Sequence, residues 1–302
     1  MMTRPLNDTA PAYSPQRLEP MLVAVRDSSV DHSAVEWAAA RAVLLRAPMT
    51  LLHAVADPAL MPPDAPYQEV VAAGRALISN AAARVLRDHP GLRIGTYLHC
   101  GGVVEALLGL AEVVPMIVVG ADRKDPDSGE FQGSVALQVA LNASATVVVV
   151  PPEHAYAAAG GQHRGGVVVG VDGSELSHLC LMRAAEEASL LATALTVVTA
   201  LSSLSGPMSV NSSTMLSEVR ARFPRLVVTW IVDDLRAPVE ALVAHGVGSD
   251  LLVIGRHGSG ARTDMSLGSV THRLLLEPPC STLVITRREP ELPAGETGQG
   301  AA

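Results

Sequence analysis

The stretch VAVRDS at Val23–Ser28 recurs in the second half of the chain as VGVDGS at Val169–Ser174. The residues that follow this stretch also match between the two halves, with a constant difference in residue number. A second set of matches follows later in the chain, after extra residues in the first half. The matched positions are His32 with His178, Ala38 with Ala184, Thr50–Ala54 with Thr196–Ala200, and Val104–Leu107 with Val239–Leu242. An internal repeat of this length means that one structural unit occurs twice.

Each copy alternates two kinds of segment. Short runs rich in valine suit β-strands, and longer runs rich in alanine and leucine have a helical period. Continuous apolar runs such as Val147–Val150 suit strands that are buried on both faces, as in a parallel sheet covered by crossover helices. The expected strands are 21–25, 50–55, 93–99, 116–120, 146–150, 167–171, 195–200, 226–232, 251–255 and 282–286. The expected helices are 33–46, 69–88, 103–112, 134–142, 177–192, 211–223, 238–245 and 269–276.

The 302 residues suffice for two α/β domains that each bury a core. We expect these domains at residues 19–152 and 164–288. The linker between them and the two tails are rich in proline, glycine and alanine, and we expect the tails to be disordered. The extra residues of the first copy are expected in the proline-rich stretch 60–68.

Composition excludes several classes of function. The formal net charge is −8 and Lys124 is the single lysine, so the chain has no basic stripe to neutralise a nucleic-acid backbone. Cys100, Cys180 and Cys280 are odd in number and widely spaced, which predicts three buried thiols and no metal site. The N-terminus lacks a signal pattern and no apolar run approaches the roughly 20 residues that span a bilayer. A soluble cytoplasmic protein, without a membrane partner, is expected.

Two loops of the second copy carry the chemistry. In a doubly wound sheet, ligands bind beyond the carboxyl ends of the strands, where the strand order reverses. The first of the two loops follows the first strand and contains Asp172, Gly173 and Ser174. The second runs from Gly255 to Ser269 in the pattern G-x-x-G-x9-G-S, with its other glycines at 258 and 268.

This pattern is typical of a phosphate-binding loop. Glycines let backbone N–H groups approach phosphate oxygens, and we expect Gly258 to need a positive φ. Gly268 and Ser269 open a helix, whose N-terminal N–H groups and dipole attract anions, and the Ser269 hydroxyl adds a donor. Asp172 has the wrong charge for phosphate and is placed to accept a hydrogen bond from a base or ribose. His257 is interpreted either as a phosphate contact or slow phosphoacceptor, or as a solvent-facing loop residue.

A simpler interpretation is that these glycines only end strands and start helices. The full spacing, the partner loop at Asp172 and the comparison with the first copy favour nucleotide binding instead. Other nucleotide motifs are missing from the sequence. Thr263 stands where a dinucleotide fingerprint would have its third glycine, and no Gly-Lys pair forms a Walker A loop.

Both copies resemble universal stress protein domains, over nearly the whole chain outside the tails and linker. The ATP-binding members of that family carry G-x-x-G-x9-G-[S/T], which Gly255, Gly258, Gly268 and Ser269 match. For each domain the resemblance implies a doubly wound, five-stranded parallel sheet in the order 3-2-1-4-5 with helices on both faces. It also implies ATP bound across the first and fourth strands, and pairing of domains through the fifth strands.

The same matching implies roles for single residues of the second copy. Asp172 would bind adenine or ribose, and Ala200 would line the base pocket. Ile254 and Val270 would flank the phosphate loop.

The first copy departs from the pattern. Arg26 stands where the second copy has Asp172, and Arg123 stands in place of Gly258. Residues 121–132 carry a net charge of −2 and residues 256–267 a net charge of +1, so the second loop attracts a triphosphate and the first repels it. We therefore expect one ATP per chain, in the second copy. A weaker site in the first copy stays open, because Arg123 could bind phosphate and Gly120, Gly133 and Ser134 remain.

The sequence predicts an ATP-binding regulatory module that acts in stress or growth adaptation, with ATP bound alone or with Mg²⁺. The alternative is a slow ATPase or another ATP-using enzyme, with Arg256, Arg262 and Asp264 as the charged candidates near the γ-phosphate. A third interpretation, a structural dimerisation protein, predicts no nucleotide. The expected partners are ATP, a second copy or domain that pairs through the fifth strands, and an unidentified protein.

Overall fold

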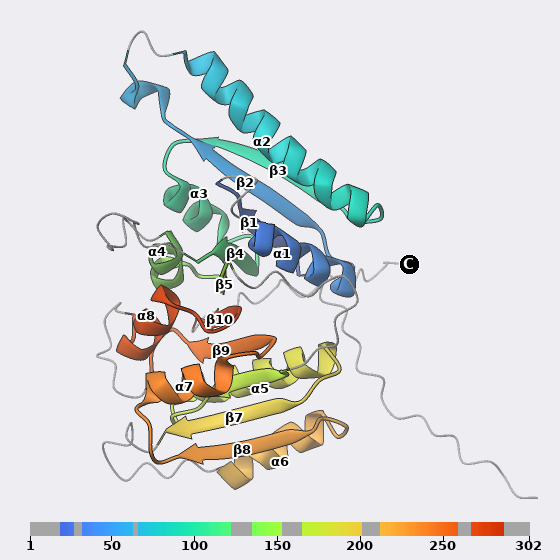
Figure 1. Ribbon diagram of the computed structural model, residues 1–302, viewed down its shortest axis with the longest axis vertical. Coiled ribbons are helices and arrows are strands. Elements are labelled where there is room, and N and C mark those ends of the chain that lie inside the picture. Colours follow the sequence, from blue (N-terminus) through green and yellow to red (C-terminus); the bar gives the residue numbers. More distant parts are fainter. Residues whose placement is uncertain are drawn as a thin grey trace, which may run out of the picture.

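The computed structural model describes residues 19–26, 32–62, 66–121, 135–152, 165–200, 212–258 and 267–286, arranged as two similar halves (Figure 1). The first half contains β1 (Met21–Ala24), α1 (His32–Leu45), β2 (Met49–Val55), the 3₁₀ helix η1 (Pro58–Leu60), α2 (Tyr67–Asp88), β3 (Ile94–Cys100), α3 (Val103–Leu110), β4 (Met116–Gly120), α4 (Val135–Asn142) and β5 (Thr146–Val150). The second half contains β6 (Val167–Gly170), α5 (Glu175–Leu190), β7 (Leu195–Ala200), α6 (Ser212–Arg222), β8 (Val228–Asp233), α7 (Pro238–Gly246), β9 (Leu251–Gly255), α8 (Ser269–Leu276) and β10 (Thr282–Ile285). Every strand and helix expected from the sequence is present, with ends that differ by at most two residues.

The ten strands form one continuous sheet in the order β3-β2-β1-β4-β5-β10-β9-β6-β7-β8. Within each half all neighbouring strands are parallel, and the predicted order 3-2-1-4-5 is confirmed. α1, α2, α5 and α6 pack over one apolar cluster on one face, and α3, α4, α7 and α8 pack over a second cluster on the other. The chain is therefore an α/β protein of two tandem doubly wound units.

The two halves meet at β5 and β10, the central strands in Figure 1. These strands pair antiparallel, with Val149 opposite Thr282 and Val147 opposite Val284. All four residues are buried. An unpaired apolar edge strand would expose backbone donors and acceptors and favour aggregation. The predicted pairing through the fifth strands is thus confirmed, and it occurs within one chain.

The position of the extra residues of the first half stays a prediction. α2 has 22 residues, and the described part of α6 has 11. Residues 63–65 and 201–211, which precede these helices, lie outside the described residues.

A buried cluster of four charged side chains also joins the halves. Arg41 on α1 donates two hydrogen bonds to the carboxylate of Glu187 on α5, at 2.5 and 2.7 Å, and these two side chains are 7% and 2% exposed. Arg183 donates to Glu187 at 2.9 Å and to Glu19 at 3.1 and 2.9 Å. Burial acts to raise the pKa of Glu187, but Arg41 and Arg183 outweigh it and hold that pKa below its ordinary value.

Candidate functional site

A cavity of about 680 Å³ opens beyond the carboxyl ends of β6 and β9, where the strand order of the second half reverses. Its wall comes from the loop after β6, the end of β7, the start of α7, and the loop that leads from β9 into α8. The structure places all but one of the predicted ligand residues of the second copy in this wall. They are Asp172, Ser174, Ala200, Ile254, Gly255, His257, Gly258, Gly268, Ser269 and Val270.

Asp172 is held in place by the residues that follow it. Its Oδ1 accepts hydrogen bonds from the backbone N–H and the hydroxyl of Ser174, at 3.0 and 2.7 Å. The Ser174 hydroxyl oxygen accepts in turn from the N–H of Ser177 at 3.1 Å, which caps α5. Gly173 has a φ of 84°, where a residue with a Cβ would be strained. Gly173 therefore shapes the loop without lining the cavity, and Asp172 keeps a fixed orientation.

The glycines of the second loop allow close approach between chain segments. A Cβ on Gly258 would lie 2.3 Å from Oδ2 of Asp172, and a Cβ on Gly255 would lie 2.8 Å from Cδ2 of Leu176. Among the described residues, the glycines with positive φ are Gly101, Gly166, Gly173 and Gly248. The expectation that Gly258 needs a positive φ is therefore wrong. Gly258 is required because a side chain there has no space beside Asp172.

α8 begins at the cavity wall. Its N-cap, Gly268, donates its N–H to the carbonyl of Arg256 at 2.9 Å, and the Thr271 hydroxyl donates to the carbonyl of Gly255 at 2.7 Å. These bonds tie the first turn of α8 to the end of β9. Helix geometry leaves the N–H groups of Ser269 and Val270 without intrahelical acceptors. An anion in this part of the cavity would meet those donors and the positive end of the helix dipole.

Arg256 does not serve the cavity, which corrects its assignment as a candidate cation near the phosphates. Its guanidinium donates to the backbone carbonyl of Ala143 in the first half. Its backbone N–H donates to the carbonyl of Ile285 at 2.9 Å. Burial lowers the pKa of Arg256. Arg262 and Asp264 lie outside the described residues. The net charge of +1 counted for residues 256–267 includes Arg256, but the guanidinium of Arg256 does not line the cavity.

The cavity is also lined by two charged residues that are not part of the glycine motif. Arg273 is exposed and lies one helical turn beyond Ser269 on α8. Glu240 lies in the first turn of α7, where its Oε2 accepts from the N–H of Ala237 at 3.4 Å. Residues four apart share a face of a helix, so the spacing from Ser269 was the signal that could have identified Arg273.

Part of the cavity wall is apolar. Ala200 at the end of β7, Ile254 in β9 and Leu242 in α7 are buried and line the cavity. Small-molecule sites combine such apolar walls with a few fixed polar groups. Here the polar groups gather at Asp172 and at the start of α8, and the apolar wall is available to a flat ring.

Only part of the corresponding region in the first half lies within the described residues. Gly120 ends β4 as Gly255 ends β9. Arg26 is exposed at the position that corresponds to Asp172. Gly133, Ser134 and Arg123 lie outside the described residues. A weaker or empty site in the first half therefore stays a prediction.

The cysteines partly match expectation. Cys180 and Cys280 are buried, but Cys100 is exposed and its Sγ accepts from the Tyr67 hydroxyl at 3.0 Å. The expectation of three buried thiols is wrong for Cys100 because it ends the edge strand β3. Within the described ranges, no group of three or more His, Cys, Asp or Glu side chains is placed to bind a metal ion. The helices in these ranges are also too short or too polar to cross a bilayer.

Two parallel units joined in one sheet, with a glycine-lined cavity where strand order reverses, define a tandem doubly wound α/β protein. The chain belongs to the universal stress protein family, whose sequence profile matches residues 18–151 and 164–286.

Individual relatives agree with this assignment. A universal stress protein of Mycolicibacterium smegmatis is 29% identical over 289 residues, which cover 89% of this chain and 97% of the relative. One from Mycobacterium tuberculosis H37Rv is 28% identical over 284 residues, which cover 86% and 95%. The crystal structure of a universal stress protein from Archaeoglobus fulgidus superimposes with a TM-score of 0.70 at 14% identity and covers 90% of this chain and 100% of that one. This last similarity concerns the fold alone.

Proposed function

We propose that this chain is an ATP-binding regulatory protein whose second half holds ATP, alone or with Mg²⁺, and that ATP occupancy changes a surface read by another protein in stress or growth adaptation. The observation that carries the proposal is the meeting of three features in one cavity of about 680 Å³. These are the close-packed glycine loop, the N-terminus of α8 and an apolar wall.

Each part of the nucleotide would meet a different part of the wall. The phosphates would lie against Gly258 and the first turn of α8, where backbone N–H groups are available. The base would pack on the apolar side formed by Ala200 and Ile254. Asp172, fixed by Ser174, would accept a hydrogen bond from the ribose or base. His257 lines the same wall and is a further candidate for a phosphate contact.

The alternative function is a slow ATPase on the same site. Phosphoryl transfer needs cationic groups and a metal held at the γ-phosphate. Arg256, one of the candidates for this role, instead bonds to Ala143 across the two halves. This use of Arg256 favours binding over turnover.

The direct test is mass spectrometry of small molecules released from the purified, heat-denatured full chain. We expect ATP in nearly equimolar amount. If no nucleotide is released and none binds on titration, the proposal is wrong and a structural dimerisation role gains support. Many turnovers per minute with Mg²⁺ would favour the enzyme instead.

A first prediction concerns stoichiometry. Calorimetric titration of the nucleotide-free full chain should give one ATP per chain, because Arg26 replaces the acceptor Asp172 in the first half. Using the full chain matters, since separated halves would expose the apolar strands β5 and β10. Two sites of comparable affinity would contradict the asymmetry.

A second prediction concerns Arg273. Arg273→Gln should weaken ATP binding by roughly fivefold to tenfold, since an exposed guanidinium contributes less than a buried one to binding a phosphate. AMP, which has no γ-phosphate, should lose less. The matched control is His272→Gln, its exposed neighbour on α8, which should leave both affinities unchanged. Equal losses for ATP and AMP would show that Arg273 does not contact the terminal phosphates.

A further inference from the structure

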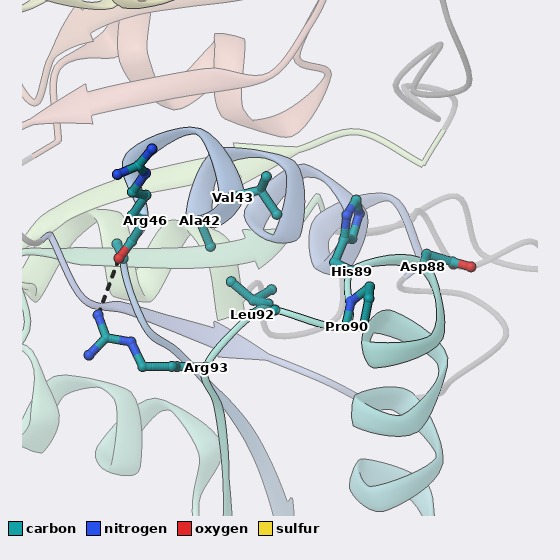
Figure 2. Close-up of a pocket in the computed structure, with 10 residues that line it drawn as sticks. Ala42, Val43, Arg46, Asp88, His89, Pro90, Leu92 and Arg93 are labelled. Atoms are coloured by element: carbon teal, nitrogen blue, oxygen red, sulfur yellow. Dashed lines mark hydrogen bonds between the residues drawn. The ribbon is translucent and has the colours of Figure 1, made fainter.

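A second cavity, of about 540 Å³, lies in the first half at the end of the sheet opposite the glycine loops. It is formed between the C-terminal end of α1 and the turn that leads from α2 into β3 (Figure 2). Val43 and Leu92 lie at its centre, Arg46 and Arg93 at one end, and His89 and Asp88 toward the other (Figure 2). Cavities of this size hold small organic molecules in other proteins.

The positive end of this cavity contains two exposed arginines that are joined by a hydrogen bond. Nη2 of Arg93 donates to the backbone carbonyl of Arg46 at 3.2 Å. Arg46 has a φ of 52° at the C-terminus of α1, a position where glycine is usual. Among the described side chains, no carboxylate lies within ion-pair distance of Arg46 or Arg93. Among these described residues, no acid competes with an anion for the remaining N–H donors of the two arginines.

The second half provides an internal comparison for the same turn. Phe223 corresponds to His89 because the two residues make the same backbone hydrogen bonds. The N–H of Phe223 donates to the carbonyl of Val219, and the N–H of His89 donates to the carbonyl of Val85. Each of the two carbonyls then accepts from the N–H of the leucine three residues later. Phe223 is buried in the core, whereas the smaller, polar His89 is only half-buried. Ala192 and Val227 stand in place of Arg46 and Arg93 in that half. The fold therefore requires neither the imidazole nor the two guanidinium groups.

We propose that this cavity binds a small organic anion that has an apolar body. Arg46 and Arg93 hold its carboxylate or phosphate group with charge-assisted hydrogen bonds. Val43 and Leu92 contact the apolar body, and His89 supplies a further polar contact at the far end. Asp88 is the one acid among the described residues of the cavity wall, so the two arginines leave a net positive charge in this part of the wall. This site is independent of the ATP cavity, which lies in the other half.

Methyl NMR on the full chain tests the proposal, with phenyl phosphate and benzoate as probes. Signals of Leu92 and Val43 report on this cavity, and signals of Leu267 and Val270 report separately on the ATP cavity. We expect at least one of the two anions to shift the Leu92 and Val43 signals at millimolar concentration. The preferred anion separates a phosphate ligand from a carboxylate ligand. Neutral benzyl alcohol should bind at least about tenfold more weakly.

Two variants and one control complete the test. Arg93→Gln should weaken the binding about tenfold, and His89→Phe combined with Arg93→Val, which introduces the residues of the second half, should abolish it. Arg225→Gln, on the corresponding turn of the second half, should change nothing. The proposal is overturned if neither anion shifts the Leu92 and Val43 signals. It is also overturned if the anions bind as well to Arg93→Gln as to the original chain, or if benzyl alcohol binds equally well.

Discussion

Glu187→Gln is expected to lower the free energy of unfolding of the full chain by about 3–5 kcal/mol. The carboxylate of Glu187 is 2% exposed and accepts hydrogen bonds from both Arg41 and Arg183. A neutral amide would leave two buried guanidinium groups in the interface, where Glu19 is within ion-pair distance of both. Urea denaturation, followed by circular dichroism, measures the loss.

The matched control for this variant is Glu218→Gln, which removes an exposed partner of His178. Exposed pairs contribute about 1 kcal/mol or less, so this change should be small. A Glu187 effect no larger than the Glu218 effect would show that the buried cluster does not hold the halves together.

The contribution of Glu187 should also depend on pH. The folded pKa of Glu187 is lowered, so its stabilisation is present above its ordinary pKa of 4.5 and is lost as the pH falls through the folded pKa. The stability difference between the original chain and Glu187→Gln should therefore shrink below about pH 4.5. A difference that is constant into strongly acidic solution would contradict the assignment.

Gly258→Val is expected to weaken ATP binding about a hundredfold or more, the equivalent of two lost hydrogen bonds to a charged group. Its Cβ would lie 2.3 Å from Oδ2 of Asp172, so either the loop or the carboxylate must move. Such a movement would displace both the proposed phosphate contact and the proposed ribose or base contact. Calorimetry on the folded variant measures the affinity.

Two further variants separate the causes. Asp172→Ala removes the carboxylate that is proposed to contact the ribose or base. It should weaken the binding of ATP and adenosine alike. Gly109→Val, in α3 of the first half, adds a side chain where nothing lies within 4 Å and should leave the affinity unchanged. Full ATP affinity in both Gly258→Val and Asp172→Ala would remove the cavity from consideration as the nucleotide site.

The sequence allowed most of the fold and the outline of the candidate site to be predicted. Continuous valine runs such as those in β5 and β10 are diagnostic because strands buried on both faces must be apolar throughout. Comparison of the two copies aligned the strands without knowledge of any contact. The glycine spacing led to residues that line one cavity, because backbone approach depends on the absence of a Cβ, which the sequence states directly.

The remainder depended on where long side chains point. Arg256 is adjacent to the glycine loop in sequence, yet its guanidinium crosses to Ala143, a contact that only the pairing of the halves creates. Gly258 owes its requirement to Asp172, which is far away in the chain. The repeat shows that the first half has extra residues, but whether they lie in the loop before α2 or in α2 itself stays open, because residues 201–211 before α6 lie outside the described residues.

The ion pair between Arg41 and Glu187 has a further consequence. The shift that relates His32 to His178 also relates Arg41 to Glu187, so the two residues occupy equivalent places in the repeat. Antiparallel pairing of β5 with β10 relates the halves by an approximate two-fold axis, and this pair faces across it. In a symmetric dimer of one half, two identical charges would meet there in a buried position and repel. A chain that contains both halves can place opposite charges on the axis, so we expect each half to pair with the unlike half and not with a copy of itself.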